Sequence, residues 1–485
     1  MESARQLRRE RMITAAGAAL LAFGLIASAP RADYAIPEGY TFTRLAIVPG
    51  PGPGTESFVD DFEPHAINAA GNVAFAADLM GGGSNIGEGV FASRAGKLLQ
   101  IMSPGDPAPG GHNFSSSEES GVLGMTPLNN PGAGAFAYIL DTWDPATPLG
   151  LNSGLYRFSL NVPRPSAVVV PGVTPSPTGH SGDTFAGVYV NPTLNDVGHL
   201  VFAGIAPYPQ LTDNPGYNGL GVGLFMADSH DRISKIVAPG DPAPQGGVFD
   251  DAFQGWMNNR GTIGFEAHVA GEECVNIGSP LVCGAGLYRR SSLGTIRSIA
   301  QQGDPAPGGG HYRQAFGAVM NDRDDLVFIG DLTPAPDLLQ SLGVFLNSAG
   351  KTSAVARPGD AMPGGGHFVT ASEFPYVARI NNVGTISFVA RLDTQTFNNG
   401  VHDTGLYARS NGKLQLVART GTVISGVGTI AQINNPLYAD LDGAAFFDEP
   451  AINDAGQIFF EATLTDGSGV LLIASPHPKH SWPGQ

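Results

Sequence analysis

The chain lacks several features that would place it in a familiar functional class. After its N-terminus it has no long helical stretch rich in Ala, Glu, Lys and Leu, which argues against a helical protein. It contains no Gly-x-Ser-x-Gly, no His-Glu-x-x-His and no phosphate-binding loop, so no motif assigns an enzyme class. Positive charge is scarce, with 26 Lys and Arg against 43 Asp and Glu and a formal net charge of −17. Because so acidic a surface repels nucleic acids and anionic lipids, we expect no nucleic-acid partner.

Cysteine is also scarce. Only Cys274 and Cys283 are present, nine residues apart and without a paired histidine, which is poor spacing for zinc. In an exported protein, two such cysteines close a small disulfide, and we expect that bond here.

Glycine and proline are abundant. The chain has 67 Gly and 38 Pro, yet 42% of its residues are apolar. This combination indicates many turns between short strands rather than disorder. We therefore expect an all-β protein.

The most informative pattern is a short phrase, Asn-x-x-Gly-x-x-x-Phe, that recurs at intervals of 60 to 72 residues. Its copies are Asn68, Gly71 and Phe75; Asn129, Gly132 and Phe136; Asn195, Gly198 and Phe202; Asn258, Gly261 and Phe265; Asn321, Asp324 and Phe328; Asn381, Gly384 and Phe388; and Asn453, Gly456 and Phe460. Such a period indicates one supersecondary unit copied in tandem, each copy stacked on its neighbours because it is too small to bury its apolar face alone.

Each unit divides into four strands. The Asn and Gly fit a tight hairpin with a type I turn and a bulge, in which the Gly position needs a positive φ. Asp324 replaces this Gly once, and Asp is among the few other residues that tolerate the conformation. A third strand opens with Gly, an aliphatic residue and usually an aromatic one, as at residues 89–91. Four antiparallel strands in each of seven units predict a seven-bladed β-propeller.

The two ends of the chain predict how the propeller closes. Residues 42–50 match a fourth strand and its loop, whereas the seventh unit stops after its third strand near Ile473. We expect the N-terminal strand to complete the last blade, which hides the sheet edges. An open β-solenoid is the alternative, although it has no use for a separate fourth strand at the front. The predicted propeller spans residues 36–475, between a leader at 1–35 and a tail at 476–485.

The N-terminus has the pattern of a targeting segment. Four arginines between residues 5 and 11 precede an apolar run at 15–27, which is short for a membrane span but suits a secretory signal. Arg8-Arg9 hints at twin-arginine export. The alternative is that this run stays in the membrane as an uncleaved anchor.

The tandem phrase, together with the Pro-Gly-Asp loops at 104–106, 239–241 and 358–360, resembles the choice-of-anchor tandem repeat proteins, an exported bacterial family with the NxxGxxxAF motif. The resemblance covers about Tyr40 to Ser475. It implies an exported protein of uncharacterised activity and supplies no catalytic residues. After Ile473 the chain departs from the family pattern, with no sorting motif or apolar tail. This favours a soluble periplasmic or secreted protein without a membrane span in the mature chain.

The Pro/Gly loops between units supply one set of site candidates. They are expected to be stiff without strand pairing, and to lie on the same face as the variable loops between second and third strands. The candidate ligand-face residues are Asp106, Asp241, Asp304, Asp360, His311 and His367. His and Asp from neighbouring blades could converge on a metal or a substrate. The alternative is that each Asp stabilises its own turn and each His only ends the loop.

A second candidate site is a calcium loop made by Asp440, Asp442 and Glu449, in which Tyr438 occupies the place of the first acidic ligand. The alternative is an ordinary turn, because one essential ligand is missing. The cofactor stays unknown, and calcium is the ion that this loop suggests.

Three functions fit these features. The leading hypothesis is an exported, monomeric, non-enzymatic binding or scaffold module whose ligand is a glycan or a cell-surface protein. Its ligand would lie on the face made by the Pro/Gly loops and the variable loops near 141–153, 206–221, 268–284 and 393–404. The alternative is a carbohydrate- or polymer-active enzyme with its site in the propeller funnel. A structural cell-surface protein held by a partner is the third.

Overall fold

The computed structural model shows an all-β chain. It describes residues 39–53, 56–116, 121–142, 152–178, 182–189, 192–208, 219–271, 274–275, 282–283, 285–334, 341–371, 378–396, 402–433 and 450–477. Within these ranges no helix is long and apolar enough to cross a membrane. The all-β prediction is confirmed, while the predicted leader lies outside the described residues.

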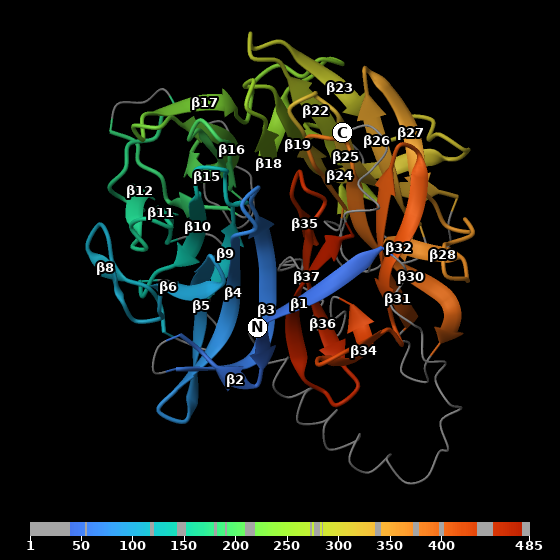
Figure 1. Ribbon diagram of the computed structural model, residues 1–485. Helices are drawn as coiled ribbons and strands as arrows, with labels where there is room; N and C mark the ends of the chain where they lie inside the picture. Colours follow the sequence, from blue (N-terminus) through green and yellow to red (C-terminus); the bar gives the residue numbers. More distant parts are fainter. Residues whose placement is uncertain are drawn as a thin grey trace.

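The described strands form seven sheets of four to six strands, arranged around one axis in chain order (Figure 1). The first sheet contains β2 (Gly50–Pro51), β3 (Ser57–Ile67), β4 (Val73–Gly81), β5 (Ser84–Arg94) and β6 (Lys97–Met102); the second contains β9 (Val122–Met125), β10 (Ala133–Ile139), β11 (Ser153–Ser159) and β12 (Ser166–Val169); and the third contains β13 (Gly187–Val188), β14 (Thr193–Leu194), β15 (Leu200–Pro207), β16 (Leu220–Ala227) and β17 (Ile233–Val237). The fourth sheet contains β18 (Phe249–Met257), β19 (Ile263–Val269), β22 (Gly286–Arg290) and β23 (Ile296–Ala300); the fifth contains β24 (His311–Met320), β25 (Leu326–Thr333), β26 (Leu342–Ser348) and β27 (Lys351–Ala356); and the sixth contains β28 (Phe368–Ala371), β29 (Ala378–Ile380), β30 (Ile386–Thr396), β31 (His402–Ser410) and β32 (Lys413–Arg419). The seventh sheet contains β33 (Val423–Ile424), β34 (Gly428–Ile433), β35 (Ala451–Ile452), β36 (Ile458–Leu464), β37 (Gly469–Pro476) and β1 (Tyr40–Val48). Two short pairs complete the described strands, β7 (Pro107–Ala108) with β8 (His112–Asn113) and β20 (Cys274–Val275) with β21 (Val282–Cys283). The fold is a β-propeller, as predicted.

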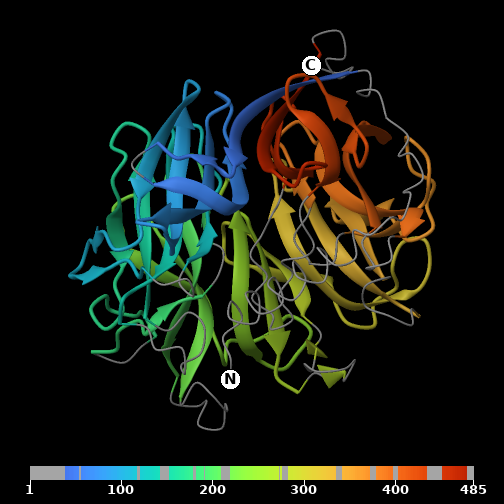
Figure 2. The ribbon, with the colours of Figure 1, turned by 90° about the horizontal axis from the view of Figure 1, so that it is seen from below.

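The N-terminal strand closes the ring. β1 pairs antiparallel with β37, from Tyr40 opposite Pro476 to Val48 opposite Gly469. Figure 2 shows this strand reaching across to the last sheet. It also carries Phe42, whose ring lies 6.3 Å from that of Phe460 in the same sheet. The prediction that the N-terminal strand completes the last sheet is confirmed, and the open solenoid is excluded.

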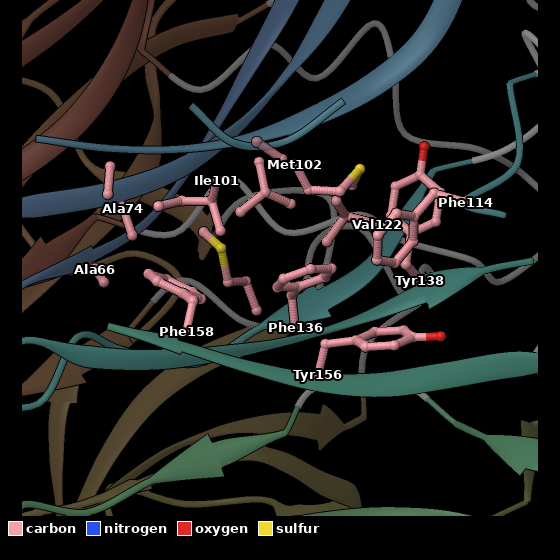
Figure 3. Packing of buried hydrophobic residues seen from close by; sticks show 14 of the residues in the cluster. Ala66, Ala74, Ile101, Met102, Phe114, Val122, Phe136, Tyr138, Tyr156 and Phe158 are labelled. Carbon is pink, nitrogen blue, oxygen red and sulfur yellow. The ribbon is translucent and has the colours of Figure 1, made fainter. Parts of the chain in front are cut away.

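Three aromatic side chains pack together inside six of the sheets. In the sheet of β24 to β27, Phe328 stacks on Phe345 with ring centroids 5.6 Å apart, and Tyr312 from the first strand meets Phe345 edge-on at 5.2 Å. The same trio recurs as Phe58, Phe75 and Phe91; Phe114, Phe136 and Tyr156; Phe185, Phe202 and Phe225; Phe249, Phe265 and Tyr288; and Phe368, Phe388 and Tyr407. Figure 3 shows Phe136 lying over Tyr156 beside Phe114. Each such ring pair stabilises by about 0.5–1.5 kcal/mol beyond its buried area.

The Gly that opens the third strand makes room for the aromatic ring two residues later. At Gly89, an added Cβ would lie 2.7 Å from Leu79 Cδ1 and 2.9 Å from the Phe91 ring. At Gly405 it would lie 2.6 Å from the Tyr407 ring. A larger residue would therefore push the aromatic side chain out of its stack, which explains the Gly–aliphatic–aromatic pattern.

The Asn of each repeat shapes its own hairpin. Asn195 Oδ1 accepts a hydrogen bond from the main-chain N–H of His199 at 2.8 Å, and the Gly198 N–H donates to the Asn195 carbonyl at 3.1 Å. Gly198 has a φ of 85°, and Asp324 has a φ of 65° at the equivalent position. The predicted positive φ is confirmed at both residues.

In the repeat phrase, the Gly forms the turn of the hairpin and the Phe packs in the core of the sheet. In the first sheet, Gly71 has a φ of 74°, and the fully buried Phe75 stacks on its neighbour in the next strand with ring centroids 5.5 Å apart. In the sheet of β28 to β32, Gly384 has a φ of 88°, and the fully buried Phe388 stacks on the ring of Tyr407 at 5.7 Å. The phrase therefore needs Gly for its backbone conformation and Phe for the aromatic trio.

The same Asn side chain links each hairpin to the next. Its Nδ2 donates to the main-chain carbonyl of the equivalent Asn one sheet further on, at 2.8 to 3.3 Å. These donors run from Asn68 to Asn129, Asn195, Asn258, Asn321, Asn381 and Asn453, and Asn453 donates back to Asn68. All of them are buried, so losing one bond would leave an unpaired polar atom inside the protein. We call this closed circle the Asn ring.

A buried carboxyl group links two sheets farther along the strands. Glu266 on β19 accepts hydrogen bonds through Oε1 from the main-chain N–H of Gly317 at 2.6 Å and of Ala318 at 3.4 Å, on the bulged part of β24. Burial raises the pKa of Glu266 to about 8, and the two N–H donors oppose this rise. The side chain therefore holds a proton at neutral pH.

The Asn ring makes the first prediction. Replacing Asn195 by Asp keeps the Oδ1 acceptor for its hairpin but removes the N–H that donates to the Asn258 carbonyl. We expect the free energy of unfolding in denaturant to fall by about 1–3 kcal/mol. Asn85→Asp is the matched control, because Asn85 accepts from the Gly87 N–H in a local turn, a role that Asp can keep. The control should change stability by less than about 0.5 kcal/mol. Equal losses in both variants would contradict a stabilising role for the ring.

The pKa of Glu266 makes the second prediction. Between pH 4.5 and 8 the unfolded chain has released this proton while the folded protein keeps it, so stability falls as pH rises, by up to about 1.4 kcal/mol per pH unit. Glu266→Gln keeps a neutral acceptor and should remove this slope in chemical unfolding measured from pH 4 to 8. Below pH 4.5 the residue is neutral in both states, which provides the internal control. Parallel stability curves for the two proteins would show that Glu266 is already ionised in the folded state.

Candidate functional site

The hairpins of the Asn ring meet at one end of the propeller axis and surround a cavity. Its volume is about 140 Å³, measured as the space open to the centre of a water molecule. One water needs about 10–15 Å³ on this measure, so the cavity has room for about ten. Its wall comes from every repeat and includes the apolar residue before each Asn, namely Ile67, Leu128, Leu194, Met257, Met320, Ile380 and Ile452. We call it the axial cavity.

The residues that follow the repeat Asn form a second circle around this cavity. They are Ala69, Asn130, Asp196, Asn259, Asp322, Asn382 and Asp454, and we call them the axial ring. The main-chain N–H of each of the first six donates to Oδ1 of the next, at 2.7 to 3.1 Å. The side chains are therefore held in fixed orientations by the main chain of the neighbouring sheet.

Carboxamide and carboxylate groups alternate in the axial ring. Asp196 Oδ2 accepts from Nδ2 of Asn130 at 2.8 Å and of Asn259 at 3.0 Å, and Asn259 Nδ2 also donates to Asp322 Oδ2 at 2.8 Å. Asn382 Nδ2 donates to Asp454 Oδ2 at 3.3 Å. The alternation ends at Ala69, which has no polar side chain, so the axial ring is open between the first and last sheets.

An aromatic residue and a cation lie beside the cavity. Trp256 of β18 lines its wall, and the Arg379 guanidinium of β29 lies 4.8 Å from the centre of the Trp256 ring. Burial lowers the pKa of Arg379, although it stays high enough for the side chain to be charged at neutral pH. This contact joins the first strands of two sheets that are not neighbours in the ring, and it fixes the indole.

The residues predicted from the Pro/Gly loops lie at the opposite end of the propeller. The first strand of a sheet runs from its Pro/Gly loop to its repeat Asn, as β24 does from His311 to Met320, just before Asn321. Ten residues at about 3.3 Å each separate the two ends by about 30 Å. The loops do share their end with the variable loops, because β24 pairs His311 with Thr333 at the end of the second strand. We call this end the loop face.

The four loop carboxylates each stabilise their own turn. Oδ2 accepts from the main-chain N–H three residues earlier, at 2.8 to 2.9 Å, in Asp106, Asp241, Asp304 and Asp360. These bonds are the ones expected if each Asp stabilises its own turn. None of the four carboxylates lies in the wall of the axial cavity. A ligand role for them stays a prediction.

The prediction that the loops lack strand pairing is wrong. β7 pairs with β8, and isolated bridges join Pro242 to Val248, Pro305 to His311 and Ala361 to His367. Each loop folds back on itself because its Gly residues adopt positive φ, as Gly365 does at 95°.

The two predicted histidines are exposed and differ in their partners. His367 Nδ1 lies 2.9 Å from Asp393 Oδ2, and its main-chain N–H donates to Asp393 Oδ1 at 2.6 Å. These bonds lower the pKa of Asp393. The equivalent His311 lies opposite Thr333, whose hydroxyl donates to the His311 carbonyl at 3.4 Å. Only His367 of the two thus has a carboxylate on its imidazole among the described residues.

Two arginines fasten both of these loops. Arg419 is fully buried and donates to the Gly364 carbonyl at 2.6 Å, in the loop before His367. Arg357 donates to the carbonyls of Pro307 and Gly309 at 2.7 Å, in the loop before His311. The main chain before each of the two histidines is therefore held in place by an arginine.

The metal and disulfide predictions remain untested. Asp440, Asp442 and Glu449 lie outside the described residues. Within the residues that the structure covers, no group of three or more His, Cys, Asp or Glu side chains could hold a metal ion. The backbone of β20 and β21 places Cys274 opposite Cys283, and a bond between their side chains stays a prediction.

Sequence reasoning missed the axial cavity. The residue after each repeat Asn is alternately Asn or Asp, apart from Ala69, and this alternation could have been read from the repeat alignment. The alternation gave no signal because Asn and Asp are common at ordinary turn positions for local reasons.

Comparisons with known proteins give a family and distant structural neighbours. Several solved structures are similar to this chain at low identity. The propeller domain of the trilobed protease from Pyrococcus furiosus is 9% identical, with a TM-score of 0.43, over 85% of this chain and 96% of that one. An acylaminoacyl peptidase from Pyrococcus horikoshii is 9% identical, with a TM-score of 0.43, over 86% of this chain and 52% of that one, so this chain spans about half its length. A gluconolactonase from Xanthomonas campestris is 11% identical, with a TM-score of 0.36, over 89% of this chain and 100% of that one.

A comparison with curated proteins gives no match. Residues 43–305 and 223–470 each match a family of unknown function, DUF7453, and the two matches together cover most of the chain. The chain therefore belongs to the DUF7453 family.

Proposed function

We propose that this protein is an exported, seven-bladed, monomeric binding or scaffold propeller that holds a glycan or a cell-surface protein on its loop face and performs no chemistry on it. The observation that carries the proposal is the closed Asn ring, in which one identical bond repeats around the whole axis and returns to its start. Such a ring makes a rigid base, and the loops at the other end are free to differ.

The loop face has the construction of a binding surface. Its Pro/Gly loops are capped by their own carboxylates and, in two sheets, are fastened by Arg357 and Arg419. Loops pre-formed in this way lose little conformational entropy when a ligand binds. A periplasmic or secreted location, and kinship with the choice-of-anchor repeat proteins, are part of the proposal.

One observation favours the alternative, a carbohydrate- or polymer-active enzyme. His367 has its Nδ1 on a carboxylate, and this arrangement orients a histidine that acts as a general base. The pair is exposed on the loop face rather than enclosed in the funnel. We therefore place binding first and the enzyme second.

A combined binding and turnover assay tests this choice. The purified chain is incubated with a panel of bacterial and plant polysaccharides, and bound protein and newly formed reducing ends are both measured. We expect binding to at least one polysaccharide without release of reducing ends, and unchanged binding by His367→Asn. The variant should fold, because Asn113 occupies the equivalent place in another sheet and donates to Asp141 at 2.9 Å.

His311→Asn is the matched control, since it makes the same change at the histidine without a carboxylate partner. Release of reducing ends that is lost in His367→Asn and kept in His311→Asn would establish the enzyme instead. Absence of binding to every member of the panel would refute a glycan ligand.

A further inference from the structure

The axial cavity has the features of a second binding site, at the end of the axis away from the loop face. The polar groups of the axial ring surround it, and it opens toward solvent past these partly exposed residues. The indole of Trp256 lies in its wall. We propose that the axial cavity binds a polyhydroxylated ring, such as a cyclitol or the terminal sugar of a glycan. This inference rests on the proposed binding function and names a different site for it.

The alternation of the axial ring selects the ligand class. Each carboxylate only accepts hydrogen bonds, and each carboxamide nitrogen offers two N–H donors. The described bonds use one donor of Asn382 Nδ2, and they use two acceptor sites each of Asp322 and Asp454, out of about four on a carboxylate. Donors and acceptors thus remain side by side around the opening.

A hydroxyl group suits such a ring because it donates and accepts at once. A cation would satisfy the carboxylates but has no acceptor for the second N–H of Asn130 and of Asn382, which the described bonds do not use. An anion would meet three carboxylates, those of Asp196, Asp322 and Asp454, and no positive side chain lines the described wall. Neighbouring hydroxyls on one ring, which repeat the donor and acceptor pattern, match the wall best.

Ala69 is the place where the ring admits a ligand. In the three equivalent positions that carry Asn, the side-chain Oδ1 accepts from a main-chain N–H of the preceding sheet and Nδ2 donates to a carboxylate of the axial ring. At Ala69 only a methyl group stands between Asp454 and Asn130, although its main-chain N–H still donates to Asn130 Oδ1 at 3.1 Å. A ligand hydroxyl would occupy the position that an amide fills elsewhere.

Apolar groups on the wall complete the fit. Trp256 is held by Arg379, and the residues before each repeat Asn form an apolar belt below the axial ring. The C–H face of a sugar or cyclitol packs on such a surface while its hydroxyls meet the polar ring. The cavity volume of about 140 Å³ allows one ring and excludes a longer oligomer from its interior.

The experiment uses the full chain, with myo-inositol, methyl β-D-glucoside and cellobiose as probes, by calorimetry and by tryptophan fluorescence. Binding of myo-inositol alone identifies a free cyclitol, whereas binding of the glucoside and cellobiose identifies a glycan end. Ala69→Asn should complete the axial ring, lower the affinity for the bound probe at least tenfold and raise the unfolding temperature by a few degrees. Ala70→Asn, the same change one residue outside the ring, should alter neither quantity.

Asp454→Asn gives an independent check, because it removes one carboxylate without filling the opening and should weaken binding without raising the unfolding temperature. Binding by Ala69→Asn equal to that of the wild type would overturn the inference and leave the loop-face function standing. Binding of ethylammonium or Ca²⁺ in place of all three polyols, or no binding of any probe at 50 mM, would also overturn it.

Discussion

The fold depends on the side-chain carboxamide of the repeat Asn, which forms hydrogen bonds through both its oxygen and its nitrogen. In every repeat, the oxygen of the Asn side chain fixes its own hairpin, and the nitrogen donates to the next hairpin around the axis. A carboxylate could perform the first task and not the second, since it has no hydrogen to donate. Burial makes the requirement strict, because an unpaired buried polar atom costs about 1–3 kcal/mol. The local turn and the global ring are therefore specified by the same residue.

The ring explains how stability and variation are separated along the strands. At the Asn end the units are tied by repeated bonds, and in the middle they are filled by aromatic trios such as Phe328, Phe345 and Tyr312. At the loop end four Pro/Gly loops share a carboxylate cap, and an arginine also holds two of them. Changes on the loop face thus leave the contacts that hold the sheets together untouched.

Local features could be predicted from the sequence with good accuracy. The positive φ at Gly198 and Asp324 follows from turn chemistry, and the pairing of the N-terminal strand with the last sheet follows from counting strands within a repeat. Both depend on residues close in sequence or on one period. The role of the loop Asp residues in capping their own turns was also predicted, as the alternative to a role in ligand binding.

Contacts between units could not be predicted in this way. Asn195 and Asn258 lie 63 residues apart, and no local rule indicates that the nitrogen of one faces the carbonyl of the other. The same holds for Trp256 and Arg379, which meet because the ring brings distant first strands to one axis. Single positions in the first strand, such as Tyr312, gave no signal of their own, because an aromatic residue after a loop fits many environments.

Closure by β1 has a consequence for the order in which the protein assembles. The hydrogen bond from Thr41 to Ser475 joins residues 434 positions apart, so the final sheet stays one strand short until nearly all of the chain has emerged. Until then β1 has no partner strand, and its unpaired edge can take up another strand. Contacts between such distant segments also form slowly. A cell that makes this protein must keep the early segment available, and unattached to other strands, until the last sheet arrives to receive it.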